Sequence, residues 1–339
     1  METNRNLRFI LMLFGFFLFS CLAIENLQMN ALPKYTLEEN EEYIVVWNRT
    51  DIGMNPNNRR PAMVGGSGRI VVDGRKMQPL ALRQIYGLDS LNGDEVWEIA
   101  NAGNGELIID GEQLYYGAVG WAKVISYNIN NGKSAWSTSL PWAHSVTDIY
   151  FANDKIFVHT NDSEFFVLSN DGEILDNFSE TFRVFLEMDN VLYMEALSSV
   201  KAVEISSKQE IWHLRLDDGY THAPIFENGT IFIRTRGSSP TYIYSIDQTT
   251  GAVNWKVSRE VLSNLYLSGD KIYYISRDGF LISIARSTGD EISRVKFSPD
   301  IDLNALTGDF FITGDPANDI IVVSFAGNHQ IMGIKVINP

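Results

Sequence analysis

The amino-acid sequence predicts an all-β protein, a seven-bladed β-propeller in which four-stranded antiparallel sheets surround a central axis. The first observation is a nine-residue frame that ends in Gly, has Trp four positions later, and returns at intervals of about forty residues. The second is that short runs rich in Val, Ile, Tyr and Phe alternate with Gly, Asn and Asp turns, as in strands joined by hairpins. The third is the lack of a sustained helical period in residues 43–339.

The frame predicts where the turns and the large side chains lie. It is most complete in Ile85–Gly93 with Trp97, Val124–Gly132 with Trp136, and Ile243–Gly251 with Trp255. Altered copies have Lys208 at the Gly position before Trp212, Ser293 at the Trp position after Gly289, and a frame one residue short at Phe165–Gly172. Because Gly takes a positive φ at little cost, the third and fourth strands can reverse tightly. An indole on the fourth strand can cover the seam to the next sheet. We therefore expect structural roles for Trp47, Trp97, Trp136, Trp212, Trp255, Gly93, Gly132, Gly251 and Gly289.

One unit illustrates the expected strands. They are Ala223–Glu227, Thr230–Thr235, Thr241–Asp247 and Val253–Val257. Asn228–Gly229 and Thr249–Gly251 supply two of the turns between them. Counting fourth strands in the same way gives six units, whose fourth strands lie near Trp97, Trp136, Leu175, Trp212, Trp255 and Ser293.

A seventh unit is split between the two ends of the chain. Ile331–Lys335 aligns with Ile85–Asp89 and supplies a third strand, but the sequence stops at Pro339 before a fourth. Tyr43–Trp47 is a strand ending in Trp with no unit of its own before it. We expect this strand to complete the last sheet and to close the ring, which removes the open edges of the array. An eight-bladed ring is the main alternative.

Residues 1–24 are expected to be an export signal or a membrane anchor. Arg5 and Arg8 precede an apolar run from Phe9 to Ile24, which is typical of an export signal. Leu18–Cys21 is similar to a bacterial lipoprotein cleavage box and makes Cys21 a candidate for lipidation. The bulky Phe19 and the continuation of the apolar run past Cys21 favour an uncleaved anchor instead, and a fully cleaved signal is the third outcome.

Residues 25–42 are expected to be a tether, and residues 43–339 the propeller. The tether carries four glutamates, and its apolar residues follow no period. The protein is therefore expected outside the cytoplasm, attached to a membrane by its N-terminal segment.

The frame resembles the pyrroloquinoline quinone (PQQ)-type propeller repeat, whose pattern is Ala-x-Asp-x-x-Thr-Gly-Lys-x-x-Trp. Asp247, Thr250, Gly251 and Trp255 match this pattern with the correct spacing. Partial matches are Asp89, Gly93 and Trp97, with Asn92 in place of Thr, and Gly132, Lys133 and Trp136. The resemblance covers residues 43–338 and implies a quinoprotein-type propeller fold.

The resemblance does not extend to the chemistry of the PQQ-dependent dehydrogenases. Those enzymes are much longer, usually have eight blades, and have adjacent cysteines beside the quinone and a calcium-binding carboxylate cluster. Here Cys21 is the single cysteine, so residues 43–339 contain none. The similarity is therefore to short, non-catalytic members of the family. These include the lipoprotein of the outer-membrane β-barrel assembly machinery, whose eight blades differ from the seven counted here.

The sequence contains no recognisable catalytic or metal-binding constellation. Its five histidines are scattered over several units, and no pair has the spacing of metal ligands. No Gly-rich phosphate loop precedes a helix. We therefore expect no catalytic residues, no metal and no cofactor. The net charge of −15 and the lack of a strongly basic region argue against nucleic-acid binding.

The best candidate for a binding surface is the set of connections that precede the first strand of each unit, because they would line one mouth of the central channel. Two of these connections carry an aromatic residue and a histidine at equivalent places, which makes the candidate residues Trp142, His144, Tyr220 and His222. The first hypothesis is a non-catalytic interaction scaffold for protein partners. The alternative is an enzyme or ligand-binding propeller with a quinone- or sugar-type ligand at the mouth.

Overall fold

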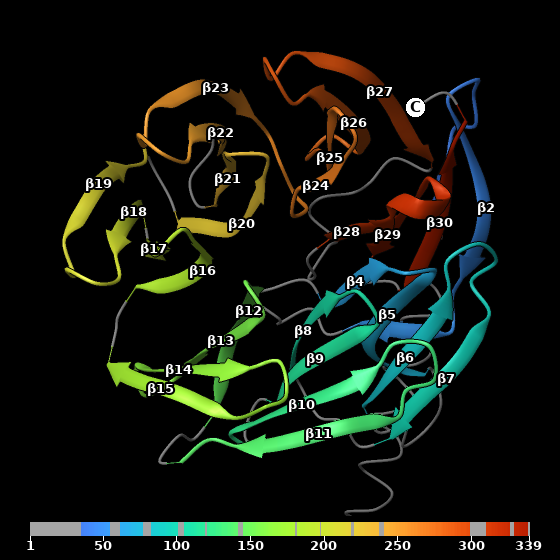
Figure 1. Ribbon diagram of the computed structural model, residues 1–339. Coiled ribbons are helices and arrows are strands. Elements are labelled where there is room, and N and C mark those ends of the chain that lie inside the picture. The colour runs from blue at the N-terminus through green and yellow to red at the C-terminus, as the bar shows by residue number, and fades with distance from the viewer. Residues whose placement is uncertain are drawn as a thin grey trace, which may run out of the picture.

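The computed structural model describes residues 35–54, 62–76, 83–100, 105–118, 121–141, 145–179, 182–196, 198–217, 220–236, 241–298, 310–325 and 329–337. These residues form seven antiparallel sheets around a central axis (Figure 1). One turn of 3-10 helix, η1 (Pro316–Asn318), interrupts the described strands. The prediction of an all-β, seven-bladed propeller is confirmed, and the alternative of eight blades is wrong for the described part of the chain.

Blades 1 to 4 follow one another along the chain, and each runs from the centre outward. Blade 1 contains β4 (Met63–Gly66), β5 (Arg69–Lys76), β6 (Gln84–Asp89) and β7 (Glu95–Ala100). Blade 2 contains β8 (Gly105–Asp110), β9 (Gln113–Ala118), β10 (Lys123–Asn128) and β11 (Ser134–Ser139). Blade 3 contains β12 (Val146–Ala152), β13 (Lys155–Thr160), β14 (Glu164–Ser169) and β15 (Ile174–Ser179). Blade 4 contains β16 (Arg183–Met188), β17 (Val191–Ala196), β18 (Ser199–Glu204) and β19 (Glu210–Arg215).

Blades 5 to 7 complete the ring, and the strands predicted for blade 5 are found with slightly longer ends. Blade 5 contains β20 (Tyr220–Glu227), β21 (Thr230–Arg236), β22 (Thr241–Asp247) and β23 (Val253–Arg259). Blade 6 contains β24 (Tyr266–Ser268), β25 (Lys271–Ile275), β26 (Phe280–Ala285) and β27 (Glu291–Ser298). Blade 7 contains β28 (Phe310–Asp315), β29 (Ile320–Phe325), β30 (Gln330–Val336) and, from the other end of the chain, β2 (Tyr43–Arg49).

The N-terminal residues contribute to three blades. Strand β2 pairs antiparallel with β30, with Tyr43 opposite Val336 and Arg49 opposite Ile331. Strand β3 (Ile52–Met54) pairs with β5 of blade 1. Strand β1 (Thr36–Leu37) lies within residues 25–42, the segment expected to be a tether, and it pairs with β27 as a fifth strand of blade 6.

The hydrophobic core lies between the sheets rather than within any one of them. Val71 and Ile85 of blade 1, for example, belong to one buried cluster with Leu107, Leu114 and Tyr116 of blade 2. Each blade alone would expose both faces of its sheet to water. Burial of these faces against the neighbouring blades is therefore what stabilises the ring.

The frame also produces a β-bulge in the pairing of the third and fourth strands. In blade 1, Gly87 lies opposite Trp97 and Leu88 opposite Glu95, which leaves Val96 as the extra residue. The other blades have a register shift at the equivalent place. A bulge increases the local twist of the strand. It therefore helps to turn the outer strand and to aim the tryptophan at the next blade.

The strand directions define two faces of the ring. We call the face where the first strands end and the second strands begin the turn face; it lies, for example, at Asp110–Gln113 of blade 2 and Ala152–Lys155 of blade 3. We call the opposite face, where the second strands end at Ala118, Thr160 and their equivalents, the loop face. The connections chosen from the sequence as a candidate binding surface belong to the loop face.

Candidate interaction face

Near the turn face, tryptophan side chains join neighbouring blades. Each of five indoles donates a hydrogen bond from Nε1 to a backbone carbonyl in the following blade. The pairs are Trp47 to Ser90 at 2.9 Å, Trp97 to Ile129 at 2.7 Å, Trp136 to Asn170 at 2.8 Å, Trp212 to Gln248 at 2.9 Å and Trp255 to Arg286 at 2.9 Å. A polar handle on a large apolar ring suits this position, because the ring covers the seam while the N–H group stays paired.

The frame glycines lie against the same indoles. Gly132 has a φ of 68°, and a Cβ atom added to it would lie 2.9 Å from Cδ2 of Trp97 in the preceding blade. The equivalent relation holds between Gly93 and Trp47, Gly251 and Trp212, and Gly289 and Trp255. The Gly and the Trp of one frame therefore contact different neighbours. The glycine receives the indole of the blade before it, and the tryptophan reaches the blade after it.

Two seams depart from this pattern. Between blades 3 and 4, Asp176 lies opposite Val167, where the other frames have Trp, and Lys208 takes the Gly position with a φ of 59°. The Nζ atom of Lys208 lies 5.7 Å from the ring centre of Phe178. Between blades 6 and 7, the hydroxyl groups of Tyr43 and Ser293 share a hydrogen bond of 2.7 Å. A phenol from β2 therefore lies where the missing indole would be.

Near the loop face, buried polar side chains join the blades instead. Asp73, His159, Glu195 and Arg234 lie on second strands, each opposite the first residue of a frame. All four side chains are buried. Their rotational equivalents in other blades include Gly117 and Ser324. Ionisable side chains at one repeated position are therefore a feature of blades 1, 3, 4 and 5.

Three of these side chains bond to the first strand, or to its approach, in the following blade. Oδ2 of Asp73 accepts a hydrogen bond of 3.0 Å from the backbone N–H of Gly105. Nε2 of His159 accepts one of 3.1 Å from the N–H of Val184. Arg234 donates one of 3.2 Å to the carbonyl of Val261. These bonds satisfy backbone groups that would otherwise be buried without a partner.

Burial changes the acidity of Asp73. Its carboxyl group is removed from water, which raises its pKa to about 6, although the charge of Arg83 and the N–H of Gly105 oppose this shift. Nε of Arg83 lies 3.3 Å from Oδ1 of Asp73. A comparable ion pair joins Asp148 of blade 3 to Arg183 of blade 4 at 3.2 Å. The seams at this face thus contain charges that are paired but poorly solvated.

One large apolar side chain at the loop face remains exposed. Trp121, in the connection between β9 and β10, is 60% exposed. The next residue, Ala122, accepts a backbone hydrogen bond of 2.8 Å from Leu140, and the adjacent Pro141 is exposed as well. The connection that carries Trp121 therefore lies beside the one that leads from blade 2 to blade 3. An exposed tryptophan next to a proline is typical of a protein-binding surface.

The residues selected from the sequence are only partly placed. Trp142 and His144 lie outside the described residues, although Pro141 and Val146 on either side of them belong to the connection beside Trp121. Tyr220 and His222 lie on the first strand of blade 5, opposite Arg236 and Arg234, and only their backbone is described. Blade 4 separates the two pairs, so they do not lie on neighbouring blades.

Sequence reasoning missed Trp121 because this residue stands outside the frame. Six of the seven tryptophans were assigned, five to the frame and one to the candidate site, and Trp121 is the remaining one. That remainder was the available signal. The second-strand ionisable residues were missed too, although Asp73 interrupts an apolar run in β5 and could have been found from this interruption.

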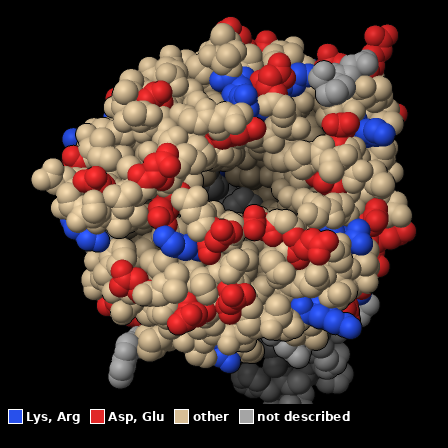
Figure 2. All heavy atoms as spheres, viewed as in Figure 1, with Lys and Arg blue, Asp and Glu red and all other residues tan. Residues whose placement is uncertain are grey.

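The turn face is acidic around the central hollow. Figure 2 shows this hollow and the carboxylates that surround it. Residues at or beside the connections between first and second strands include Asp110, Asp154, Asp189, Glu227, Asp270 and Asp319. Burial and the nearby charge of Asp154 raise the pKa of Asp110. Within the described ranges, no group of three or more metal-ligating side chains is found, and no helix is long and apolar enough to span a bilayer.

The repeated frame, the seven sheets and the tryptophan seams define a PQQ-like β-propeller. Comparison with protein families agrees, and the chain belongs to the family whose model is described as outer membrane protein assembly factor BamB, matched over residues 81–181 and 184–335. The resemblance inferred from the sequence is therefore confirmed. No curated protein matches the sequence significantly.

Solved structures share the fold at low sequence identity. A chain in the crystal structure of a mitotic checkpoint complex is 12% identical, with a TM-score of 0.68, and the match covers 91% of this chain and 98% of that one. BamB from Moraxella catarrhalis is 14% identical, with a TM-score of 0.53, over 91% of this chain and 99% of that one. At these identities the comparison establishes the propeller fold.

Proposed function

We propose that this protein is a non-catalytic, membrane-tethered propeller that works outside the cytoplasm as a scaffold for protein partners. The observation that carries the proposal is Trp121, 60% exposed beside the exposed Pro141 at the loop face of a ring whose other frame tryptophans are bonded within seams. Large aromatic side chains supply much of the binding energy of protein interfaces. Membership of a family described as an outer membrane protein assembly factor supports a role in assemblies of proteins.

The remaining parts of the proposal concern how the ring is built and held. Residues 1–24 attach the protein to the membrane, either as an uncleaved anchor or through a lipid on Cys21. The pairing of β2 with β30 supports ring closure by the N-terminal strand. The frame residues Trp97, Gly132 and their equivalents serve the seams, so they are not available to a ligand. Trp142, His144, Tyr220 and His222 remain candidate contacts on the same face.

The test is a comparison of partner capture by variants of the full chain. Trp121→Ala removes the exposed indole, and its matched control is Ile211→Ala, another half-exposed apolar side chain, on the outer strand of blade 4. Membrane extracts are passed over each immobilised variant, and retained proteins are quantified by mass spectrometry. We expect Trp121→Ala to reduce retention of specific partners about tenfold or more, which corresponds to a hot-spot loss above about 1.4 kcal/mol. The control should leave retention unchanged.

Two results would contradict the proposal. Equal retention by Trp121→Ala, and by a second variant that combines Trp142→Ala with Tyr220→Ala, would exclude the loop face as the binding surface. Tight calorimetric binding of a quinone or a sugar to the purified propeller would favour the alternative of a ligand-binding or enzymatic role.

A further inference from the structure

The first described residues of the chain are fixed to the ring by a compact set of contacts, which we call the latch (Tyr35–Leu37). The N–H of Tyr35 donates to Oε1 of Gln330 at 2.8 Å, and Nε2 of Gln330 donates back to the Tyr35 carbonyl at 2.6 Å. The Tyr35 ring lies 4.7 Å from that of Phe325. Tyr35 and Leu37 are 4% and 2% exposed. The latch is therefore part of the buried core between blades 6 and 7.

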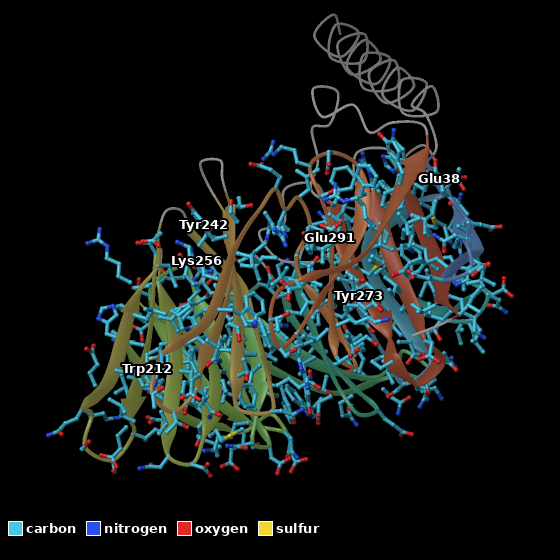
Figure 3. All side chains as sticks on the ribbon, turned by 90° about the horizontal axis from the view of Figure 1, so that it is seen from above. Glu38, Trp212, Tyr242, Lys256, Tyr273 and Glu291 are labelled. Carbon is cyan, nitrogen blue, oxygen red and sulfur yellow. The ribbon has the colours of Figure 1, made fainter. Side chains whose placement is uncertain are left out.

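The latch also fixes the face at which the preceding chain reaches the ring. Gln330 begins the third strand of blade 7, and Phe325 ends its second strand, so both lie at the loop face. Strand β1 runs antiparallel to β27, with Thr36 opposite Ser298, the last residue of that strand. In Figure 3, Glu38 lies on the same side of the ring as Tyr242, which is near the loop-face end of β22, whereas Trp212 lies on the opposite side. The chain ahead of Tyr35 therefore arrives from the loop face.

The spacing between the latch and the apolar segment is short. Residues 25–34 separate the end of that segment from Tyr35. Ten residues span at most about 35 Å when fully extended, and less in any other conformation. A strand of six residues is itself about 20 Å long. The tether can therefore reach the near face of the ring easily, but it is too short to let the ring turn over without releasing the latch.

We infer that the latch holds the loop face toward the membrane, so that the surface around Trp121 binds a protein embedded in that same membrane. The inference rests on the proposed attachment through residues 1–24. A membrane protein is favoured over the lipid surface itself because the chain has a net charge of −15, which opposes adsorption to anionic headgroups. The acidic turn face would then point away from the bilayer.

The orientation can be measured by energy transfer to the membrane. An azide-bearing residue placed at Trp121 or, for the turn face, at Leu91 carries a donor fluorophore without use of the native Cys21. The full chain is incorporated into phosphatidylethanolamine–phosphatidylglycerol vesicles that contain acceptor-labelled lipid. We expect at least twofold higher transfer efficiency from position 121 than from position 91. Equal or reversed efficiencies would overturn the inference.

Two further variants test whether the latch causes the orientation. Gln330→Ala removes both hydrogen bonds to Tyr35, and insertion of a twenty-residue Gly/Ser linker after Asn30 leaves the latch intact but lengthens the tether. Each change should reduce the difference between the two positions by half or more. An unchanged difference in the linker variant would contradict the role of the short tether, even if Gln330→Ala fails to fold.

Failure of the underlying attachment is recognised separately. Vesicle sedimentation before the fluorescence measurement shows whether the chain binds the membrane at all, and its absence from the pellet would overturn the attachment and the orientation together. A photo-cross-linking residue at position 121 in native membranes identifies the partner. Cross-linked peptides from a membrane-embedded protein support the inference, whereas peptides from a soluble protein alone would overturn the assignment of the partner.

Discussion

At the scale of single residues, the seams use two different chemistries. Indoles and glycines meet near the turn face, while Asp73, His159 and Arg234 bond to the backbone of the next blade near the loop face. A buried ionisable group costs desolvation free energy even when it is paired. These positions therefore exchange some stability for fixed geometry at the face that carries Trp121.

Asp73 gives this trade a measurable pH dependence. Its pKa is raised by burial from 3.8 to about 6 in the folded protein, so the folded state binds the proton more tightly than the unfolded state. Its contribution to stability is therefore greatest below pH 4 and decreases as the pH rises through 6. Asp73→Asn removes this titration but retains an oxygen that can accept from Gly105. The free energy of unfolding of the variant relative to the wild type should rise by about 2 to 3 kcal/mol between pH 4 and pH 7.

Denaturant unfolding at a series of pH values measures this difference. The matched control is Asp110→Asn, because the pKa of Asp110 is also raised but its side chain lies at the turn face and is less buried. Its effect on stability should vary less with pH than that of Asp73→Asn. A constant difference between Asp73→Asn and the wild type across this range would contradict the assignment.

At the scale of the element, a blade is completed by its neighbours. The frame glycine of each blade is shaped by the indole of the preceding blade, which explains why the same two residue types recur at a fixed spacing although they do not contact each other. The steric demand of that indole, and not only the turn, requires glycine.

Two glycines of blade 2 separate the turn from the seam. Gly111 and Gly132 both have positive φ angles, of 54° and 68°, but a Cβ atom on Gly111 would have no neighbour within 4 Å, whereas one on Gly132 would meet Trp97 at 2.9 Å. Gly111→Ala should cost about 1 to 2 kcal/mol for the backbone conformation alone. Gly132→Ala should cost a further 1 to 3 kcal/mol because it overpacks the seam.

Chemical denaturation of both variants, alone and combined with Trp97→Val, tests this interpretation. The excess cost of Gly132→Ala should fall when the indole is absent, and the cost of Gly111→Ala should not. Equal costs for the two alanine variants in the wild-type background would show that the turn alone requires glycine.

The regular elements could be predicted from sequence because the frame repeats, and the irregular ones could not. The strands of blade 5 and the number of blades follow from local patterns that recur. Strand β1 has two residues and no pattern, and its partners Phe297 and Gln330 lie far along the chain. Trp121 could not be distinguished from the frame residues by composition, since only its exposure separates it from them. Packing between distant segments therefore set the limit of the sequence analysis.

At the scale of the whole molecule, the two ends of the chain meet in blade 7. Tyr43–Arg49 pairs with Gln330–Val336 over its full length, and Tyr43 also bonds to Ser293 of blade 6. Without β2, the edge of β30 and the apolar faces beside it would be exposed to water.

Removal of β2 should therefore destabilise the entire ring. A chain that begins at Thr50 should lose thermal stability on the order of 10 °C or more relative to one that begins at Tyr35, or should aggregate. The matched control transfers residues 35–49 to the C-terminus through a flexible linker, which restores the strand at the other end of the chain. Circular dichroism on heating measures both. A truncated chain as stable as the longer one would contradict closure by β2.

The offset between each glycine and its indole bears on how blades can be exchanged between proteins. A blade cut at its frame carries half of two contacts, one indole for the blade ahead and one glycine for the blade behind. A chimera that transplants a blade with an ordinary frame beside Lys208 or Ser293 would leave an indole facing a lysine or a cavity filled by no tryptophan. Grafts should thus be tolerated between blades 1 and 2 and resisted at the junctions of blades 3 with 4 and 6 with 7.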